Sequence, residues 1–413
     1  DFIINNNSFY LDALNVSAQI ESENDLFENY TDIFFSVDQF NFGDVILNGS
    51  SAFTINGMVS DDVYLGTHDF QLVVSAEYID LNGNYNETSF TYPFSLDVVL
   101  NQPGFPYDTN SEVKASPAAV DFTNDGNTEI IFGDNSGLVH VLDSNGNPVL
   151  TDIFPYDTGN QIWGSPAVGY IDDDEFLDVV ITSKSKHLYI FDKNGLKLDF
   201  NANQYLMGTP ALGNLDNDDD LEVVFGGFSS GAKLFALNLD GSAVDGFPLE
   251  IDEKMQKGVA LADFNNNGKD DIVVGTDDNY VHLFYDNGIE ADGFPFLTND
   301  KIQAPPSILD INGEKIIFVS CNDNIFYAIN ADGNLRFSIT TSDNVNTSPA
   351  FIKINETIYI AFGSRDNHIY IVDTDGNSLT NWPITLNDNI EGGIISADVD
   401  NDGIPEIIAT TEN

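Results

Sequence analysis

The stretch that decides the fold runs from Ser116 to Gly133 and reads SPAAVDFTNDGNTEIIFG. A short apolar strand leads into an Asp/Asn/Gly loop, and a second strand of Ile and Phe follows. A hard cation such as Ca²⁺ takes about six to eight oxygen ligands, which a tight loop can supply from every second residue. The loop offers oxygens in that pattern from Asp121, Thr123, Asp125, Asn127 (through its main-chain carbonyl) and Glu129. The stretch therefore predicts a strand, a metal loop and a second strand.

The same stretch returns along the rest of the chain. Its first residue aligns with a series of later positions, which gives the anchors Ser116, Ser165, Thr209, Gly258, Ala304, Ser348 and Gly393. The anchors are separated by 44 to 49 residues, the length of one four-stranded propeller blade. Residues 102–413 are therefore predicted to form an all-β, seven-bladed propeller.

Two further motifs recur along the predicted blades, the first in blades one to six and the second in four of these. Strand 3 runs into Asn-Gly or Asp-Gly, which suits a two-residue hairpin. Strand 4 carries Gly-Phe-Pro or a shorter Phe-Pro or Trp-Pro, and proline is typical of an edge strand. The seventh repeat stops after strand 2, so we expect the natural protein to continue. Residues Gly104–Thr109 resemble a strand 4 that precedes the first blade and closes the ring with the last one.

Residues 1–101 lack the repeat and show strands of period two. Phe70, Leu72, Val74, Ala76 and Tyr78 alternate with Gln71, Val73, Ser75 and Glu77, and Phe90, Tyr92, Phe94, Leu96 and Val98 alternate with Thr91, Pro93, Ser95 and Asp97. Each set predicts a strand with one buried face. Several short strands without a helical period favour an antiparallel sandwich of the immunoglobulin-like type, which would act as a spacer.

The blade motifs resemble the FG-GAP repeat family, which forms the propeller of integrin alpha subunits. The Phe-Gly pairs that carry this resemblance are Phe132-Gly133, Phe225-Gly226 and Phe362-Gly363, each at the end of a predicted strand 2. The resemblance covers residues 102–413 and implies calcium bound in the loops between strands 1 and 2. It also implies ligand contacts on the opposite face of the propeller.

Five of the seven loops end in a carboxylate at the ninth position, and four of these are candidate calcium sites. The first is described above, and the others offer Asn214, Asp216, Asp218, Asp220 and Glu222; Asp263, Asn265, Asn267, Lys269 and Asp271; and Asp398, Asp400, Asp402, Ile404 and Glu406, with the seventh position acting through its carbonyl. The second loop keeps Asp172, Asp174 and Asp178 but starts with Tyr170, so it is doubtful. The fifth and sixth loops are shortened and should bind nothing. We expect about three to five Ca²⁺ ions.

Composition limits the possible partners and the location of the protein. The formal net charge is −53, with 67 acidic and 14 basic residues, which disfavours nucleic acid and anionic membranes as partners. No apolar run is long enough for membrane insertion. Cys321 is the only cysteine, so calcium would replace disulfides as the stabilising crosslink. Seven Asn-x-Ser/Thr sequons, at Asn6, Asn15, Asn29, Asn48, Asn86, Asn346 and Asn355, favour an extracellular or cell-surface glycoprotein.

The sequence contains no recognisable catalytic or cofactor-binding motif, so we expect a binding, adhesion or surface-assembly module instead of an enzyme. Four of the five histidines lie in strand 3 and mark repeat positions. The face opposite the calcium loops collects Lys114, Trp163, Tyr205, Met207, Lys254, Lys257, Lys301 and Gln303. This face is the candidate surface for a protein or glycan ligand, or for self-assembly.

Two other functions remain open from the sequence. The chain can be the accessory C-terminal region of a secreted enzyme, such as a subtilisin-like peptidase or a polysaccharide-degrading enzyme. It can also be a structural subunit of a cell-surface filament or layer.

Overall fold

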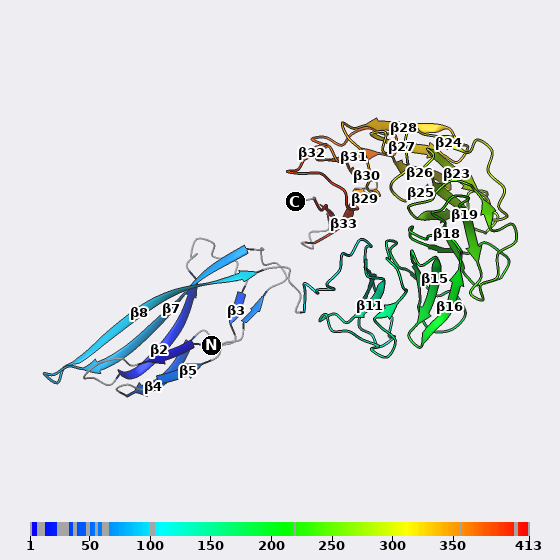
Figure 1. Ribbon diagram of the computed structural model, residues 1–413. Helices are drawn as coiled ribbons and strands as arrows, with labels where there is room; N and C mark the ends of the chain where they lie inside the picture. The colour runs from blue at the N-terminus through cyan, green and yellow to red at the C-terminus, as the bar shows by residue number, and fades with distance from the viewer. Residues whose placement is uncertain are drawn as a thin grey trace. The chain divides into compact units, whose positions relative to one another are not determined.

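A computed structural model shows an all-β chain that divides into two compact units, Asp1–Asn101 and Gln102–Asn413 (Figure 1). The residues that the structure describes are 2–5, 13–22, 33–35, 39–46, 50–53, 57–59, 66–98, 104–218, 220–354, 357–399 and 404–411. Over these residues the secondary structure consists of strands, turns and bends. Accordingly, no helix of a length and apolarity suited to crossing a bilayer occurs among them.

The smaller unit is built on one four-stranded antiparallel sheet. Its strand order is β4 (Gln39–Val45), β2 (Ala13–Ser22), β7 (Gly66–Ile79) and β8 (Tyr85–Val98). Two strand pairs accompany it, β1 (Phe2–Asn5) with β5 (Ser50–Phe53), and β3 (Ile33–Phe35) with β6 (Gly57–Val59). Alternate residues of β2 and β7 form the core of the unit: Val16, Ala18, Ile20, Phe70, Leu72 and Val74. The predicted alternation in β7 is therefore confirmed, whereas the immunoglobulin-like class stays a prediction.

The predicted buried face of β8 is wrong for most of its residues. Phe90 and Tyr92 lie directly opposite Val74 and Leu72, yet their exposed fractions are 57% and 56%. The reason is that β8 is the outer strand of the sheet, so its side chains lack a neighbouring strand on one side. Only Phe94 turns into the core, where its ring stacks on that of Phe70 at 5.5 Å.

The larger unit contains six four-stranded antiparallel sheets, here called blades one to six, followed by a two-stranded sheet. Blades one to three comprise β9 (Ala118–Val120), β10 (Glu129–Gly133), β11 (Leu138–Leu142) and β12 (Tyr156–Asp157); β13 (Ala167–Gly169), β14 (Asp178–Thr182), β15 (His187–Asp192) and β16 (Gly195–Asn201); and β17 (Ala211–Gly213), β18 (Glu222–Gly226), β19 (Lys233–Leu237) and β20 (Leu249–Glu250). Blades four to six comprise β21 (Val259–Ala262), β22 (Asp271–Gly275), β23 (Tyr280–Phe284) and β24 (Phe296–Leu297); β25 (Ser307–Ile311), β26 (Glu314–Ser320), β27 (Ile325–Asn330) and β28 (Leu335–Thr340); and β29 (Ala350–Ile354), β30 (Thr357–Gly363), β31 (His368–Asp373) and β32 (Ile384–Thr385). The last sheet pairs β33 (Ile395–Ala397) with β34 (Glu406–Ile408).

Successive blades meet through their first strands, which line the inside of the ring (Figure 1). Strand β17 contacts β13 on one side and β21 on the other, and β29 contacts β33. The predicted anchors lie at these junctions. The main-chain N–H of Ser116 donates to Oγ of Ser165, and the N–H of Ser165 donates to Oγ1 of Thr209, both at 3.0 Å. A hydroxyl at the anchor therefore links blade one to blade two and blade two to blade three.

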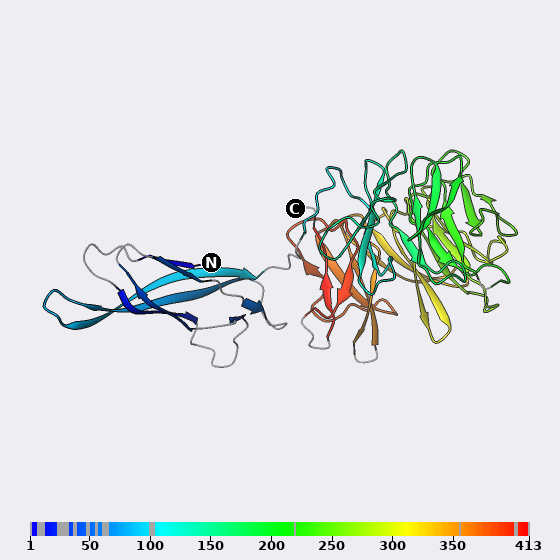
Figure 2. The same ribbon diagram turned by 90° about the horizontal axis from the view of Figure 1, so that it is seen from below.

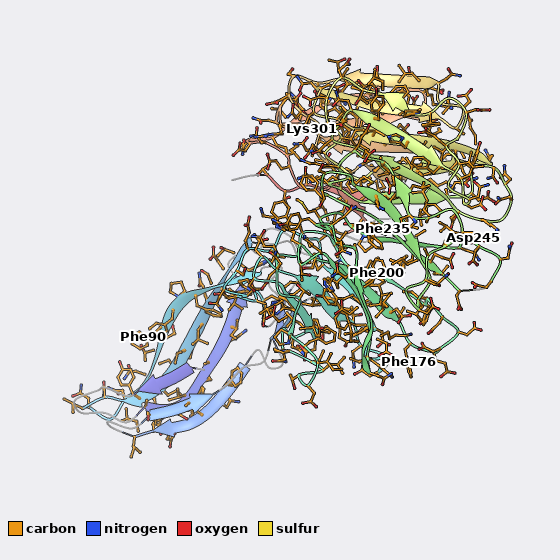
Figure 3. All side chains as sticks on the ribbon, turned by 45° about the vertical axis from the view of Figure 1, so that its right-hand side comes forward. Phe90, Phe176, Phe200, Phe235, Asp245 and Lys301 are labelled. Atoms are coloured by element: carbon orange, nitrogen blue, oxygen red, sulfur yellow. The ribbon has the colours of Figure 1, made fainter. Side chains whose placement is uncertain are left out.

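The hydrophobic core lies between neighbouring blades. Apolar side chains of β14 and β15 pack against those of β18 and β19 in one buried cluster. Phe200 of blade two meets Phe235 of blade three at 6.0 Å between ring centroids (Figure 3), and Phe326 stacks on Phe362 of the next blade at 4.0 Å. Each such buried side chain contributes roughly 1.5–3 kcal/mol, so a blade depends on its neighbours for stability. Figure 2 shows the same sheets from a second direction.

The Gly-Phe-Pro motif joins one blade to the hairpin of the next. The sequence predicted the proline inside the fourth strand, but the proline lies just before this two-residue strand. The fourth strand does lie at the outer edge of the blade, as predicted. A Cβ added to Gly246 would lie 2.3 Å from the carbonyl oxygen of Asn287, in the hairpin of blade four. Gly104 makes the equivalent approach to Asn145 of blade one. The strand that the sequence predicted at residues 104–109 does not form.

Substitution of Gly246 by Ala should destabilise the larger unit more than substitution of Gly159 by Ala. Both glycines have positive φ, +94° and +82°, so each alanine costs about 1–2 kcal/mol of backbone strain. Only Gly246 also has a backbone neighbour in the space of the new Cβ. Chemical denaturation of the two variants measures the difference, and equal losses of unfolding free energy would contradict the role of this contact.

Cys321 should not react with thiol reagents in the folded protein. Its side chain is fully buried, and burial raises the pKa of its thiol to about 12. At pH 8 an iodoacetamide or disulfide-exchange assay should therefore label the chain only after denaturation, because the thiolate is the reactive form. Rapid labelling without denaturant would show that this part of blade five opens readily.

Candidate metal centres

The candidate metal loops connect strand 1 to strand 2 of each blade, and one buried carboxylate anchors each long loop. This carboxylate belongs to the first residue of strand 2, at the ninth position of the loop. Its side chain is fully or almost fully buried in blades one to four, at Glu129, Asp178, Glu222 and Asp271. One of its oxygens accepts a main-chain N–H from the second or third loop position: Thr123 (2.9 Å), Ile171 (3.2 Å), Leu215, Phe264 (2.8 Å) and, in the last sheet, Val399 (2.8 Å).

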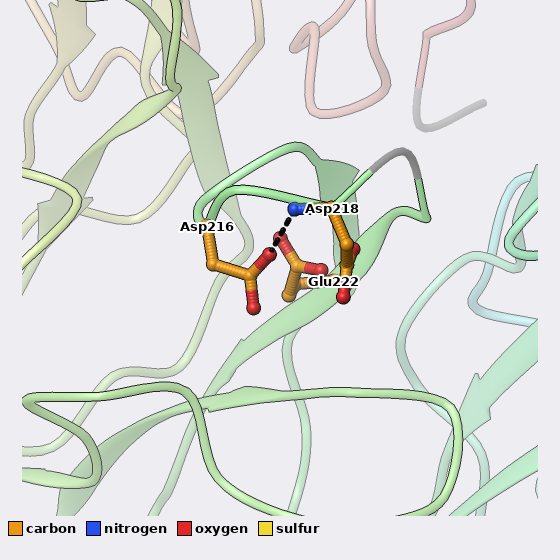
Figure 4. A group of neighbouring side chains, drawn as sticks. All are labelled: Asp216, Asp218 and Glu222. Carbon is orange, nitrogen blue, oxygen red and sulfur yellow. Dashed lines mark hydrogen bonds between the residues drawn. The ribbon is translucent and has the colours of Figure 1, made fainter.

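Blade three brings its carboxylates together. Asp216, Asp218 and Glu222 each present an oxygen within 4.8 Å of the others (Figure 4), and they are the only such trio among the described residues. Oε1 of Glu222 is buried and has no hydrogen-bond partner. Burial, with the nearby charges of Asp216 and Asp218, raises the pKa of Glu222 to about 7. An uncompensated negative cluster of this kind fits a hard cation.

The remaining predicted ligands of blade three lie close by but are not all directed at the trio. The side-chain amide of Asn214 donates to the carbonyl of Asp218 at 3.2 Å, while its main-chain N–H donates to Asp270 of blade four. The main-chain N–H of Asp220 donates to Oδ1 of Asp218 at 3.2 Å. A bound ion would therefore draw mainly on the three carboxylates.

In blades one and four the first aspartate is occupied by the loop itself. Oδ1 of Asp121 accepts the N–H of Asp125 at 3.0 Å, and Oδ2 accepts that of Gly126 at 2.9 Å. Asp263 accepts the N–H groups of Asn267 and Gly268 in the same way, at 3.0 and 2.8 Å. These bonds form the sharp turn at the glycine.

Other predicted ligands of these two loops also have protein partners. Asp125 accepts the N–H of Asn127 at 2.8 Å, and the Thr123 carbonyl accepts the Lys193 ammonium at 3.2 Å, although Oγ1 of Thr123 is buried without a partner. In blade four, the side-chain amide of Asn265 donates to Asp271 at 3.3 Å, and that of Asn267 donates to Asp286 at 3.0 Å. The Lys269 ammonium lies 3.6 Å from Asp286. Burial raises the pKa of Asp271 to about 6.

In blade two, a lysine ammonium lies among the carboxylates of the loop between strands 1 and 2. The Lys197 ammonium lies 2.9 Å from Asp172, 3.1 Å from Asp174 and 3.0 Å from Asp178. Burial acts to lower the pKa of Lys197, but the attraction of the three carboxylates outweighs it and raises this pKa. Lys197 lies far outside the loop in sequence, so the loop motif held no signal for it.

The other loops add little. Blade five turns through Asn312-Gly313, and Asp310 there pairs with Lys315 at 3.2 Å. In the last loop Asp398 and Ile404 are described, and Glu406 anchors the loop as above, but Asp400 and Asp402 lie outside the described residues.

The opposite face, formed by the loops between strands 2 and 3 and between strands 4 and 1, carries half of the basic residues of the chain. These seven of the 14 are Lys114, Lys184, Lys186, Lys254, Lys257, Lys301 and Arg365. The ammonium groups of Lys114 and Lys184 lie 4.3 and 4.2 Å from the ring centroid of Trp163, and Nε1 of Trp163 is buried without a hydrogen-bond partner.

Other parts of this basic face follow the same pattern, with some acidic neighbours. Lys186 lies over Tyr205 at 5.3 Å and Lys254 over Phe228 at 5.2 Å. Arg365 and Glu391 pair at 3.1 Å. The sequence analysis missed Lys184, Lys186 and Phe228, although the run Ser183–Lys186, which reads SKSK, was a usable signal.

The histidines have structural partners. His140 bonds buried Asp134 at 3.0 Å and stacks on Phe132 at 5.0 Å, and His282 bonds Glu290 at 2.6 Å. His187 pairs with Asp199, and Nε2 of His368 bonds the Thr385 hydroxyl. His140 and His282 share one repeat position, and His187 and His368 share another.

Comparison with known proteins identifies the fold. BBS1N, determined in complex with ARL6DN, matches with a TM-score of 0.51 and 10% identity, over 73% of this chain and 90% of its own. BamB from Moraxella catarrhalis matches with a TM-score of 0.50 and 15% identity, over 74% of this chain and 86% of its own. No protein-family model and no curated protein matches the sequence. At these identities the likeness concerns the fold alone, and it identifies an all-β protein with a β-propeller.

Proposed function

We propose that the chain is a calcium-stabilised propeller of the FG-GAP type that acts outside the cell as a non-catalytic binding module. The observation that carries this proposal is the carboxylate trio of blade three, in which Glu222 is fully buried and one of its oxygens has no partner. A buried carboxylate without a counter-charge is costly, and a divalent cation at this point removes the cost. The frequent sequons support an extracellular location, where calcium is abundant.

We further propose that the ring has seven blades, the last of which contains β33 and β34. Contact between β29 and β33 repeats the contact between other first strands, and Glu406 anchors the β33–β34 loop as its counterparts anchor theirs. Gly104 approaches the hairpin of blade one in the way that Gly246 approaches that of blade four. This equivalence supports a role for residues 104–109 in the outer part of the seventh blade.

The basic face is the proposed surface for a protein or glycan ligand. In a chain of net charge −53, a collection of seven basic residues on one face favours an acidic ligand. Trp163 supplies an apolar surface beside two ammonium groups, and such amphipathic aromatic residues are frequent at binding surfaces. The fold of BBS1N, which was determined with a bound protein, is compatible with a protein partner.

Removal of calcium should destabilise the propeller. Binding at a free concentration 100 times Kd contributes about 2.7 kcal/mol per site, so chelation should lower the melting temperature by several degrees. The double variant Asp216→Asn, Asp218→Asn should bind one calcium ion fewer per chain in elemental analysis. Asp240→Asn, in the nearby hairpin of blade three, is the matched control and should keep that ion. A chain that binds no calcium and melts identically with chelator would refute the proposal.

Loss of charge on the basic face should weaken binding to acidic probes. We expect the double variant Lys114→Glu, Lys184→Glu to bind acidic glycans on an array, or immobilised polyglutamate, at least about tenfold more weakly than the wild type, because two ammonium groups become carboxylates. Lys353→Glu is the matched control, since Lys353 is exposed at the end of β29 near the calcium-loop face. Wild-type chain that binds neither probe, or a control that loses binding equally, would contradict this role of the face.

A further inference from the structure

The fourth strand of blade two contains a β-bulge whose extra residue is Lys197. In the β15–β16 pair, Ile190 lies opposite Leu198 and Phe191 lies opposite Leu196, which leaves Lys197 unpaired. A bulge of this kind can re-aim a side chain. Here the side chain extends to the loop between strands 1 and 2 of the same blade, where its ammonium pairs with Asp172, Asp174 and Asp178.

The three carboxylates that contact Lys197 occupy the same loop positions as the trio of blade three. Asp172, Asp174 and Asp178 are the third, fifth and ninth residues of their loop, as Asp216, Asp218 and Glu222 are of theirs. The ninth residue is anchored identically, since Asp178 accepts the N–H of Ile171 and Glu222 accepts that of Leu215.

The difference between the two loops concerns the second oxygen of the ninth residue. In blade three this oxygen, Oε1 of Glu222, is buried and has no partner. In blade two it is Oδ1 of Asp178, which makes no hydrogen bond but lies 3.0 Å from the Lys197 ammonium. The ammonium thus takes the place that blade three leaves open.

We propose that Lys197 is a built-in cation, which occupies in blade two the position that a divalent metal ion takes in blade three. The ammonium has three N–H donors, and three carboxylate oxygens surround it at 2.9 to 3.1 Å. Blade two is therefore independent of metal, and its carboxylates form a latent metal site that Lys197 keeps closed. The inference rests on the proposed calcium binding only for the identity of the ion.

Blade five repeats the bulge with a second basic residue. Arg336 is the extra residue of the β27–β28 pair, because Ala328 lies opposite Phe337 and Ile329 opposite Leu335. Its guanidinium bonds Glu314 at 2.7 Å, beside the shortened loop of that blade, and Asp375 of blade six at 3.2 Å. Blades two and five are also the two that lack the proline before strand 4. In both, a continuous fourth strand with a bulge directs a positive charge to the calcium-loop face.

Replacement of Lys197 by Met should open the latent site. Lys197→Met keeps most of the aliphatic length of the side chain but removes its charge, so three carboxylates lose their counter-ion. We expect this variant to melt roughly 5–10 °C below the wild type in chelator. In calcium it should bind one more ion per chain than the wild type, by isothermal titration and elemental analysis, and should recover most of the lost stability.

Two further variants keep the test decisive. Lys233→Met removes a lysine that pairs with the exposed Glu250, away from the three carboxylates, and it should leave the calcium count unchanged. Asp174→Asn in the wild-type background should also leave the count unchanged, because blade two holds no metal there. Loss of one calcium ion in Asp174→Asn, or no gain in a folded Lys197→Met, would overturn the inference. Wild-type chain without calcium would instead refute the proposed function, and a gain in Lys197→Met would still support the latent site.

Discussion

The rest of the propeller depends on the hydrogen bond between the ninth-position carboxylate and the start of its loop. The carboxylate belongs to the first residue of strand 2, and the N–H that it accepts follows the end of strand 1, as in the pairing of Asp271 with Phe264. One side chain thus closes a long loop that has little apolar core of its own. In blade five the connection is a two-residue turn at Asn312-Gly313, and that blade has no such carboxylate.

The anchoring carboxylate is a negative charge that is buried beside further acidic side chains. Burial without compensation is unfavourable, so each blade needs a partner for the second oxygen. Blade four supplies the N–H of Asp286 to Asp271 at 2.9 Å, blade two supplies the Lys197 ammonium, and blade three supplies nothing to Glu222. The same backbone plan therefore yields a site closed by main-chain N–H groups, a site with an internal cation and a site that fits a metal ion. The compensation of the buried carboxylate therefore differs from blade to blade.

The two faces of the ring divide the charge of the chain between them. The loops between strands 1 and 2 collect carboxylates, whereas half of the few basic residues lie in the loops of the other face. Aromatic rings contact several of these lysines, as Trp163 contacts both Lys114 and Lys184. The acidic loops and the basic loops are therefore kept apart by strands that pack blade against blade.

The sequence by itself determined the period, the strand positions and the loop pattern, because alternation and turn residues act locally: the predicted strand 2 from Glu129 and the anchor at Ser165 both lie where expected. Tertiary structure alone decided the rest. Phe90 and Tyr92 alternate like core residues but lie exposed on an edge strand. Lys197 enters a loop that ends 19 residues earlier, at Asp178. The local sequence pattern predicts which side chains can act as ligands or core residues. Only the packing of strands that are distant in sequence decides which of these side chains come into contact.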